Sequence, residues 1–349
     1  MESDLVRSLR LQAKACAALG SPFHAALLER AADDLAGGGP VEPILDGWAQ
    51  DDLRSLMAAA VPLRLVGALH DLVLSGEAPS LAAAYPRPGH DADPAEAWLE
   101  AQRALTRHAA RSRAFMEHEP QTNEVRRSAA LLGGFLVVAK RTGLPLRCFE
   151  LAASAGLNLS WDQYRYRLGE ACWGPESPVV LPTEWSGRYP PLDAAPEVIE
   201  RAACDRRPTD LRDADQRRRL LAYIWPDQFE RLERIRAAIE VALARDVEVD
   251  MADASDWARR AAPREGCVTV LYHSVFWQYM PPDSQAALTQ VIEQHAKNAS
   301  ASAPFAWLRM EPPPEDMAKM EIRLTLWPDG EDRVLAHVHP HGAWVDWRD

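Results

Sequence analysis

The sequence predicts an α/β fold in which an all-helical N-terminal part precedes a mostly parallel sheet. Apolar residues follow helical spacing almost without interruption up to Arg141, with no convincing strand among them. From Leu146 onward, short segments rich in Val, Ile and aromatic residues alternate with helical ones. The length of 349 residues also exceeds what one hydrophobic core usually organises. We therefore expect two domains, at residues 1–143 and 144–349.

Cap and turn residues divide the N-terminal part into helices. Ser21 and Pro22 are typical of a helix start, and the glycines at 37–39 are typical of a helix end. Asp93 followed by Pro94 opens a longer helix in the same way. The helices are expected at 5–19, 21–37, 53–60, 63–74, 93–117 and 122–141.

The segments after Leu146 alternate as strands and helices do in a parallel sheet. Strands are expected at 146–151, 198–203, 247–249, 267–272 and 305–309, followed by an antiparallel pair at 321–327 and 334–339. Helices are expected at 154–164, at 213–244 with a break at Pro226, and at 282–299. The stretch 169–196 is rich in Pro and Trp and interrupts the alternation. We interpret it as an inserted flap.

The charge balance argues against nucleic acid as a partner. The chain carries 51 acidic and 39 basic residues, for a net charge of -12. Nucleic-acid binders instead carry clustered Lys and Arg. The one basic cluster, at 217–219, is flanked by acids, and we interpret it as a solvated helix face. A small-molecule ligand is the expected partner.

Cysteines and apolar runs indicate a cytoplasmic protein without a membrane span. The 5 cysteines are scattered without Cys-x-x-Cys spacing, which is typical of reduced thiols. The longest apolar run, 129–139, is shorter than the roughly 20 residues that a spanning helix needs, and the first residues lack the features of a signal peptide. His337, His339 and His341 would share one face of a strand, but no neighbouring acid or cysteine completes a set, so we expect no metal.

The most informative stretch is 146–159, which reads as a buried strand, a tight turn of small residues and a helix start. Glu150, Ala152, Ser154 and Gly156 occupy the positions of an acid-x-Gly-x-Gly-x-Gly pattern, with small residues in place of two glycines. A dinucleotide fingerprint would need glycines that are absent here, so we do not expect an NAD site. S-adenosylmethionine has no phosphates and tolerates such a corner, with Asn158 at its end. A plain packing corner is the alternative.

Acids follow the next two predicted strands. Asp205, just past 198–203, stands where a carboxylate would accept both ribose hydroxyls of a nucleoside. Asp253 and Ala254, just past 247–249, stand where the adenine amino group would be recognised. The alternatives are a turn aspartate at 205 and a helix N-cap at 253. Three acids after three successive strands favour the nucleoside.

Further candidates come from the fourth strand and from the helix before the first. His273 is the candidate general base, and Trp277 and Tyr279 are candidates to face a substrate or a sulfonium. Asn123, Glu124 and Arg127 are candidates to reach the same pocket and bind substrate. Alternatively, His273 is a buried structural histidine, and the polar residues at 122–124 cap and start a helix.

Two other function classes stay open. Ser154 lies between small residues at a strand-to-helix turn, as the nucleophile of an α/β-hydrolase does, and acids and histidines follow it in the order of that triad. However, that fold needs strands before the serine, and none is predicted here. The third possibility is a protein that binds a ligand without turnover, which the missing glycines favour.

Several motifs resemble an uncharacterised bacterial family, domain of unknown function 2332, over nearly the whole chain. The motifs lie at 121–124, 150–159, 164–167, 223–228, 273–279, 307–312 and 341–344. The order of elements after Leu146 also resembles the class I S-adenosylmethionine-dependent methyltransferases. This resemblance implies a Rossmann-like sheet and a methyl transfer from S-adenosylmethionine to a small or peptide-like acceptor. Ala152 departs from the family pattern, in which a glycine is expected.

Overall fold

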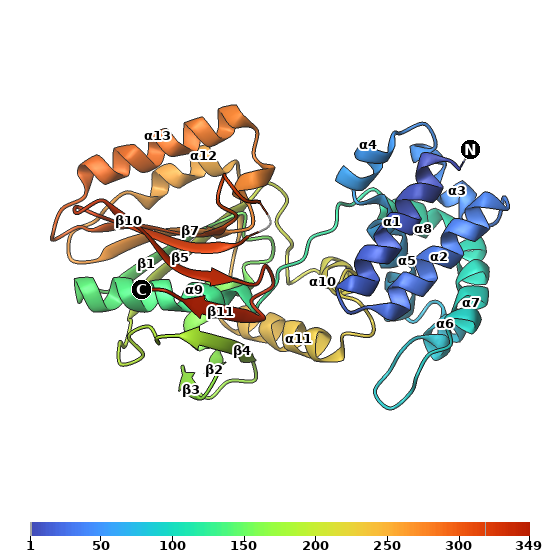
Figure 1. The fold of residues 1–349 in the computed structure, drawn as a ribbon, viewed down its shortest axis with the longest axis horizontal. Coiled ribbons are helices and arrows are strands. Elements are labelled where there is room, and N and C mark those ends of the chain that lie inside the picture. Colours follow the sequence, from blue (N-terminus) through green and yellow to red (C-terminus); the bar gives the residue numbers. More distant parts are fainter. Residues whose placement is uncertain (1, 318) are drawn as a thin grey trace. The chain divides into compact units, whose positions relative to one another are not determined.

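Figure 1 shows a computed structural model of the protein, which describes residues 2–317 and 319–349. The chain forms two compact units. Unit 1 contains the residues up to Thr122 together with Asp213–Arg236, and unit 2 contains Asn123–Arg212 and Ala237–Asp349. These units differ from the expected domains 1–143 and 144–349 in two ways. The last helix of the N-terminal part packs with the sheet of unit 2, and a later segment of the chain packs with unit 1.

Unit 1 is helical, as predicted. The expected helix at 93–117 is divided at His108 into α7 (Pro94–Arg107) and α8 (Ala109–Met116). Ser3, Ser21, Asp52 and Asp93 cap helices by accepting hydrogen bonds from backbone N–H groups. The helices of unit 1 are α1 (Asp4–Ala18), α2 (Pro22–Ala36), α3 (Glu42–Leu45), η1 (Asp46–Trp48), α4 (Leu53–Ala58), α5 (Val61–Leu74), α6 (Pro79–Ala84), α7 (Pro94–Arg107), α8 (Ala109–Met116) and α10 (Ala214–Ala222), with the first part of α11 (Phe229–Ala244).

The segment that follows α10 is held inside unit 1 by close packing and polar contacts. The Tyr223 ring packs on Gly67, where a Cβ would lie 2.8 Å from Cε1 of the tyrosine. Its hydroxyl donates to the carbonyl oxygen of His118 at 2.8 Å. The carboxylate of Asp227 accepts from Oγ of Ser21 at 2.7 Å and from the amide of Phe23 at 3.2 Å, at the start of α2. These contacts give a structural role to the 223–228 motif.

Unit 1 also buries two histidines. Burial lowers the pKa of His24 from its usual 6.5 to about 3, and that of His70 to about 4. Both side chains are therefore neutral in the folded protein at pH 5, whereas the unfolded chain would protonate them below about pH 6.5.

We predict that unit 1 loses stability as the pH falls from about 6.5 to about 4. The unfolded state takes up protons in this range that the folded state excludes, at up to about 1.4 kcal/mol per pH unit for each histidine. His24→Leu should reduce the slope of unfolding free energy against pH in urea titrations. His90→Leu, at an exposed position, should leave the slope unchanged, and equal slopes in both variants would contradict the prediction.

Unit 2 is built on an 11-stranded mixed sheet with the order β3-β2-β4-β11-β10-β9-β8-β7-β1-β5-β6. Most neighbouring strands are parallel, so the expected α/β class is confirmed. The strands are β1 (Leu146–Leu151), β2 (Arg165–Leu168), β3 (Ala171–Trp173), β4 (Val180–Gly187), β5 (Val198–Asp205), β6 (Asp250–Met251), β7 (Val268–Ser274), β8 (Phe305–Glu311), β9 (Glu321–Trp327), β10 (Glu331–Val338) and β11 (Trp344–Trp347).

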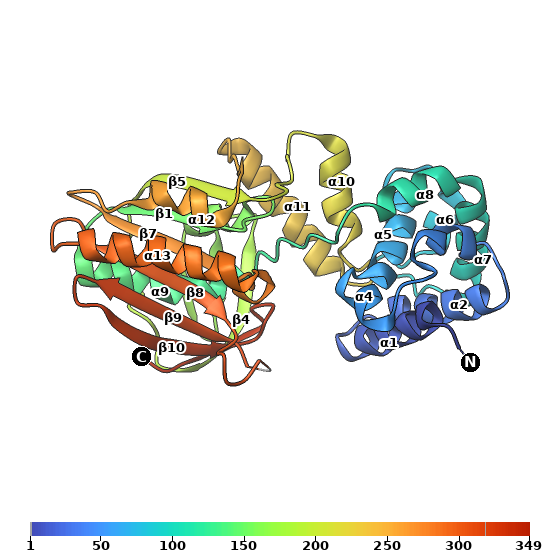
Figure 2. The same cartoon turned by 90° about the horizontal axis from the view of Figure 1, so that it is seen from above.

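Five adjacent strands of the sheet lie parallel; in chain order they are β1, β5, β6, β7 and β8, with β2, β3 and β4 inserted between β1 and β5. Across the sheet they lie in the order β6, β5, β1, β7, β8. Successive strands are thus added on one side of β1 up to β6 and on the other side from β7 onward, so the order reverses between β1 and β7. In open α/β sheets, ligands bind beyond the carboxyl ends of the strands at such a reversal. Figure 2 shows the antiparallel strands β9 and β10 continuing the sheet beside β8.

Three expectations about this sheet are corrected. The strand expected at 247–249 lies at Asp250–Met251, because Val247 and Val249 instead pack on Gly156. The helix expected at 154–164 is a short 3-10 helix, η2 (Leu157–Gln163). The stretch 169–196 is not a separate flap, since β3 and β4 lie within it and β4 joins the sheet beside β11.

Helices cover both faces of the central strands (Figure 1). The helices α12 (Ala254–Trp257) and α13 (Pro282–Asn298) pack with the 3-10 helix η3 (Ala258–Ala261) on one face, over Phe149, Leu271 and Phe305. The helix α9 (Arg127–Thr142) covers the other face. Phe135 of α9 stacks on Trp161 of η2 with 4.1 Å between ring centroids.

Two adjacent glycines let the sheet approach α9 closely. A Cβ on Gly133 would lie 2.2 Å from Cζ3 of Trp347 in β11, and one on Gly134 would lie 2.3 Å from Cδ1 of Leu308 in β8. All residues of α9 from Ser128 to Val138 are buried. The helix therefore fits the sheet only because these two positions have no side chain.

We predict that Gly133→Ala lowers the free energy of unfolding by about 2–3 kcal/mol, because the added methyl group overpacks the contact with the Trp347 ring. Urea titration followed by circular dichroism would measure the loss. Gly47→Ala is the matched control, since a Cβ there meets no atom within 4 Å. Equal stability of the two variants would contradict the prediction.

Candidate functional site

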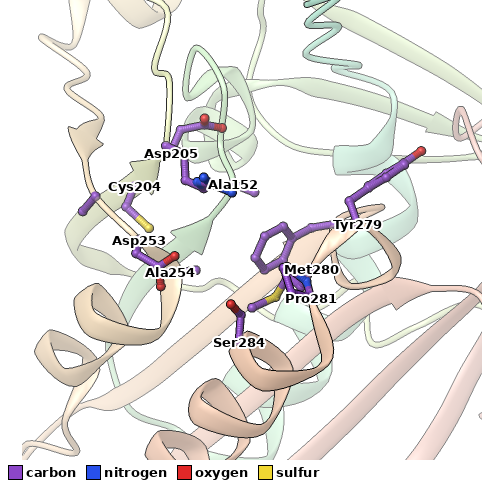
Figure 3. A pocket seen from close by; sticks show the side chains of 12 residues that line it. Ala152, Cys204, Asp205, Asp253, Ala254, Tyr279, Met280, Pro281 and Ser284 are labelled. Atoms are coloured by element: carbon purple, nitrogen blue, oxygen red, sulfur yellow. The ribbon is translucent and has the colours of Figure 1, made fainter. Parts of the chain in front are cut away.

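A pocket of about 200 Å³ lies beyond the carboxyl ends of β1, β5 and β6. Figure 3 shows Asp205, Cys204 and Asp253 facing Met280, Pro281 and Ser284. The lining is mostly apolar, as small-molecule sites usually are. The twelve lining residues are Ala152, Cys204, Asp205, Arg206, Ala252, Asp253, Ala254, Phe276, Tyr279, Met280, Pro281 and Ser284.

The turn after β1 has an unusual backbone. Ala152, Ser154 and Gly156 have φ values of 54°, 55° and 71°, in the left-handed region. These are the positions that the acid-x-Gly-x-Gly-x-Gly pattern reserves for glycine. For residues with a Cβ this conformation costs roughly 1–2 kcal/mol each. The turn thus keeps the shape of a glycine-rich loop although two of its glycines are replaced.

Asp205 holds this turn in place. Its Oδ2 accepts from the amide of Ser154 at 2.8 Å, and its Oδ1 accepts from the amide of Arg207 at 2.8 Å. Its backbone carbonyl accepts from the amide of Ala252 at 3.0 Å. Asp205 therefore connects the ends of β1, β5 and β6 and also lines the pocket. Each carboxylate oxygen has a second lone pair that a ligand hydroxyl could use.

Other amide groups of the turn are also bonded within the protein. Ala153 donates to the carbonyl of Cys204 at 3.0 Å, and Gly156 donates to that of Ala153 at 2.8 Å. The amide of Leu157 donates to Oδ1 of Asn123 at 2.9 Å. A phosphate at such a corner is held by amides of this kind. The corner is poorly suited to a phosphate, because four amide groups of the turn already donate within the protein. They belong to Ala153, Ser154, Gly156 and Leu157.

Asp253 has both of the roles weighed from the sequence. Its Oδ1 accepts from the amide of Ser255 at 2.9 Å and from the Ser255 hydroxyl at 2.6 Å, which caps α12. These hydrogen bonds hold the pKa of Asp253 below its usual value. Asp253 and the buried Ala254 also line the pocket opposite Met280 and Pro281.

His273 lies outside the pocket lining and is fully buried. Its Nε2 accepts from Nε1 of Trp307 at 3.1 Å, so its Nδ1 carries the proton and donates to Oε1 of Glu311 at 2.7 Å. A general base needs a free lone pair within reach of the substrate. Both ring nitrogens are engaged here, so the structure gives His273 a structural position instead of the expected catalytic one.

The two aromatic candidates of this loop differ. Trp277 stacks on His273, with 5.8 Å between ring centroids and an angle of 19°. Tyr279 lines the pocket and is 73% exposed. Its ring points away from the other lining side chains in Figure 3. Tyr279 is thus the member of the pair that a bound ligand can meet.

Glu150 and Asn158 lie deeper than the pocket. Oε2 of Glu150 accepts from the Tyr272 hydroxyl at 3.2 Å, and Oδ1 of Asn158 accepts from the Ser128 hydroxyl at 2.6 Å. Burial raises the pKa of Glu150 to about 8, so the side chain is mostly protonated at pH 7. Both residues support the turn from beneath and do not line the pocket.

The polar candidates near the start of α9 also bond within the protein. Oε1 of Glu124 accepts from the amide of Arg126 at 3.1 Å. Arg127 donates from Nε to the carbonyl of Pro340 at 3.1 Å and from Nη1 to that of Ser274 at 3.4 Å. Asn123, Glu124 and Arg127 are absent from the pocket lining in the described structure. They connect the start of α9 to neighbouring loops.

Two other kinds of site were weighed from the sequence, a serine triad and a histidine metal centre. Ser154 is absent from the pocket lining, and β1 is the first strand of the sheet along the described chain. The amide of His341 donates to Nδ1 of His339 at 3.0 Å, and Nε2 of His337 lies 3.6 Å from Oε1 of Glu321. Within residues 2–317 and 319–349, no group of three His, Cys, Asp or Glu side chains could hold a metal ion.

Several lining residues were not expected from the sequence. Phe276 and Met280 form part of the wall after β7, and Cys204 lies next to Asp205 at the end of β5. Phe276 belongs to the 273–279 motif. The motif therefore indicated that this segment matters, but it did not identify Phe276 as a lining residue. Cys204 is apolar in character and buried, and no sequence pattern separates it from a core cysteine.

We predict that Ala152→Gly stabilises the protein by about 0.5–1 kcal/mol, because glycine adopts the left-handed conformation without the cost of a Cβ. Ala153→Gly, one residue away with an ordinary φ, should destabilise by about 1 kcal/mol. Thermal unfolding of both variants measures the difference. Equal losses in the two variants would show that residue 152 is unstrained.

Comparisons with known proteins give one match. A protein-family model described as "Uncharacterized protein conserved in bacteria (DUF2332)" matches residues 6–347. No curated protein and no solved structure matches the chain. A search of the described helices found none with the length and apolar character needed to cross a membrane.

Proposed function

The chain belongs to this family of uncharacterised bacterial proteins, and we propose that unit 2 is a Rossmann-like domain that binds S-adenosylmethionine and transfers its methyl group. The observation that carries the proposal is the position of Asp205 in the pocket. It is the last residue of β5, the strand beside β1, lines the pocket and lies against a turn with three left-handed residues. An acid at this place in a doubly wound sheet accepts ribose hydroxyls.

The remaining lining residues fit the base of a nucleoside. Ala252, Ala254, Met280 and Pro281 offer apolar contacts to a flat ring. Asp253 supplies a carboxylate that is ionised at neutral pH and could accept from an exocyclic amino group. Asp205 would hold the ribose, and Asp253 and Ala254 would recognise the base.

The electrostatics favour a nucleoside without phosphates. Two carboxylates line the pocket, and Arg206 is the one cation among the lining residues. Amides of the turn, including those of Ser154 and Leu157, are bonded within the protein. A sulfonium nucleoside carries positive charge and no phosphate, which agrees with both features.

Methyl transfer from this cofactor requires few catalytic groups of the protein. Bound S-adenosylmethionine supplies an activated methyl group, so the protein mainly has to align an acceptor and exclude water. Because His273 is committed to Trp307 and Glu311, it is no longer assigned proton removal. We expect a small or peptide-like acceptor that can react without that base, and Tyr279, which is exposed among the lining residues, is a side chain that it could contact.

Binding without turnover is the second candidate function. The engagement of both nitrogens of His273 favours it, since no histidine is among the described residues that line the pocket. The two candidates share the nucleoside site and differ only in whether a methyl group leaves it.

We predict that the full-length protein binds S-adenosylmethionine and its demethylated product, S-adenosylhomocysteine, in isothermal titration. Asp205→Asn should weaken binding at least tenfold, because one oxygen that accepts ribose and amide hydrogens becomes a donor. Asp256→Asn, at an exposed position of α12 outside the pocket lining, should bind as the native chain does.

Two results would separate the possibilities. Absence of binding to folded native protein would overturn the cofactor proposal. Binding without formation of S-adenosylhomocysteine in the presence of a peptide pool would favour the second candidate. Product formation that Asp205→Asn abolishes would favour the methyltransferase.

A further inference from the structure

A buried glutamate outside the pocket is bonded to the pocket wall. Glu311, the last residue of β8, is 9% exposed. Its Oε1 accepts from Nδ1 of His273 at 2.7 Å and from the amide of Phe276 at 2.9 Å, and its Oε2 lies 3.2 Å from the same amide. One carboxylate thus joins the end of β7 to the first pocket residue that follows it.

The tautomer of His273 is set from its other side. Trp307 donates from Nε1 to Nε2 of His273 at 3.1 Å, which leaves the ring proton on Nδ1, facing Glu311. Trp277 stacks on the same ring. His273 therefore cannot turn or change tautomer without losing a buried hydrogen bond, and Glu311 meets a donor of fixed direction.

The backbone between His273 and the pocket is strained. Val275 has a φ of 53°, a conformation that a β-branched side chain strongly disfavours. Its amide donates to the carbonyl of Met310 at 2.9 Å. Such strain persists only where the surrounding contacts impose it, and it is found most often at functional sites. The next residue, Phe276, is held by Glu311 and lines the pocket.

We propose that Glu311 is a positioning residue for the ligand site, which keeps Phe276 and the segment 275–281 in the strained conformation that forms the pocket wall. The identity of the ligand rests on the proposed function, whereas the effect of Glu311 on the wall does not. Glu311 is not among the lining residues and acts through His273 and through the amide of Phe276.

Glu311→Gln tests the proposal because it keeps the shape and removes one acceptor. If the amide oxygen of the glutamine accepts from Phe276, its NH₂ group faces the N–H of His273, and two donors oppose each other. We expect the amides of 276–280 to exchange hydrogen at least tenfold faster and S-adenosylhomocysteine to bind at least tenfold more weakly. Glu321→Gln is the matched control, because Glu321 lies opposite Glu311 in β9 with 7% exposure and bonds to Arg323 instead.

A double variant tests the geometry itself. Trp307→Phe removes the donor to Nε2, which lets His273 move its proton there and accept at Nδ1 from the NH₂ group that Glu311→Gln introduces. Adding Glu311→Gln to Trp307→Phe should therefore weaken binding and speed exchange less than Glu311→Gln does alone. A purely structural role, such as loss of general stability, would make the two effects equal.

The outcomes keep the two proposals apart. If the native protein binds no nucleoside, the proposed function fails, and hydrogen exchange still decides the role of Glu311. Unchanged exchange at 276–280 in Glu311→Gln would overturn the positioning role. Faster exchange at 276–280 in Glu311→Gln with unchanged nucleoside affinity would also overturn the proposal, because Glu311 would then have no role in ligand binding.

Discussion

The structure of unit 2 depends on the burial of α9 against the sheet. The sheet can approach the helix closely at Gly133 and Gly134, where Trp347 and Leu308 occupy the space that side chains would take. These contacts connect β11 and β8 through one helix, although the two strands are separated in the sheet by β9 and β10. Since the packing density of a core leaves no room for adjustment, the pair of glycines fixes how the strands lie around the helix. The ends of β1 and β7, where the pocket wall begins, are held in the same sheet.

In many other sites, left-handed backbone is stabilised by glycines or by loop packing. At this pocket, carboxylates stabilise it. Asp205 ties together the ends of three strands, and Glu311 ties the loop after β7 to β8. Both support backbone with left-handed residues, at Ser154 and at Val275. The two strained segments lie at the ends of β1 and β7, which flank the reversal of strand order. Charge-assisted hydrogen bonds are strong enough to offset strain of this size.

The central strands were predictable because their signals are local. β1, β5, β7, β8 and β9 are short segments rich in apolar residues that lie close to their expected ranges. β2, β3 and β11 are short, and β11 pairs with β4, which is far away in the sequence. The apolar residues at 247–249 predicted a strand, but their side chains are needed against Gly156. Sequence patterns report that a segment is buried, and they do not report what it is buried against.

The same limit applies to the site. Asp205, Asp253, Ala254 and Tyr279 were expected from their places after strands, and all four line the pocket. His273 was expected there on the same ground, yet its partners Trp307 and Glu311 come from a different strand, so nothing near it in the sequence reveals them. The left-handed backbone of Ala152 and Ser154 is equally hidden, because alanine and serine rarely adopt it.

Neither unit is one continuous piece of chain. Residues 213–236 complete unit 1, although β1 and β5 of unit 2 precede them. During synthesis, the helical unit therefore lacks its closing segment until more than half of the protein has left the ribosome, while the sheet waits longer still for β7 and β8. Because parts of each unit are synthesised before the other unit is complete, the folding of the two units overlaps in time. No single cut of the chain can therefore separate one unit from the other.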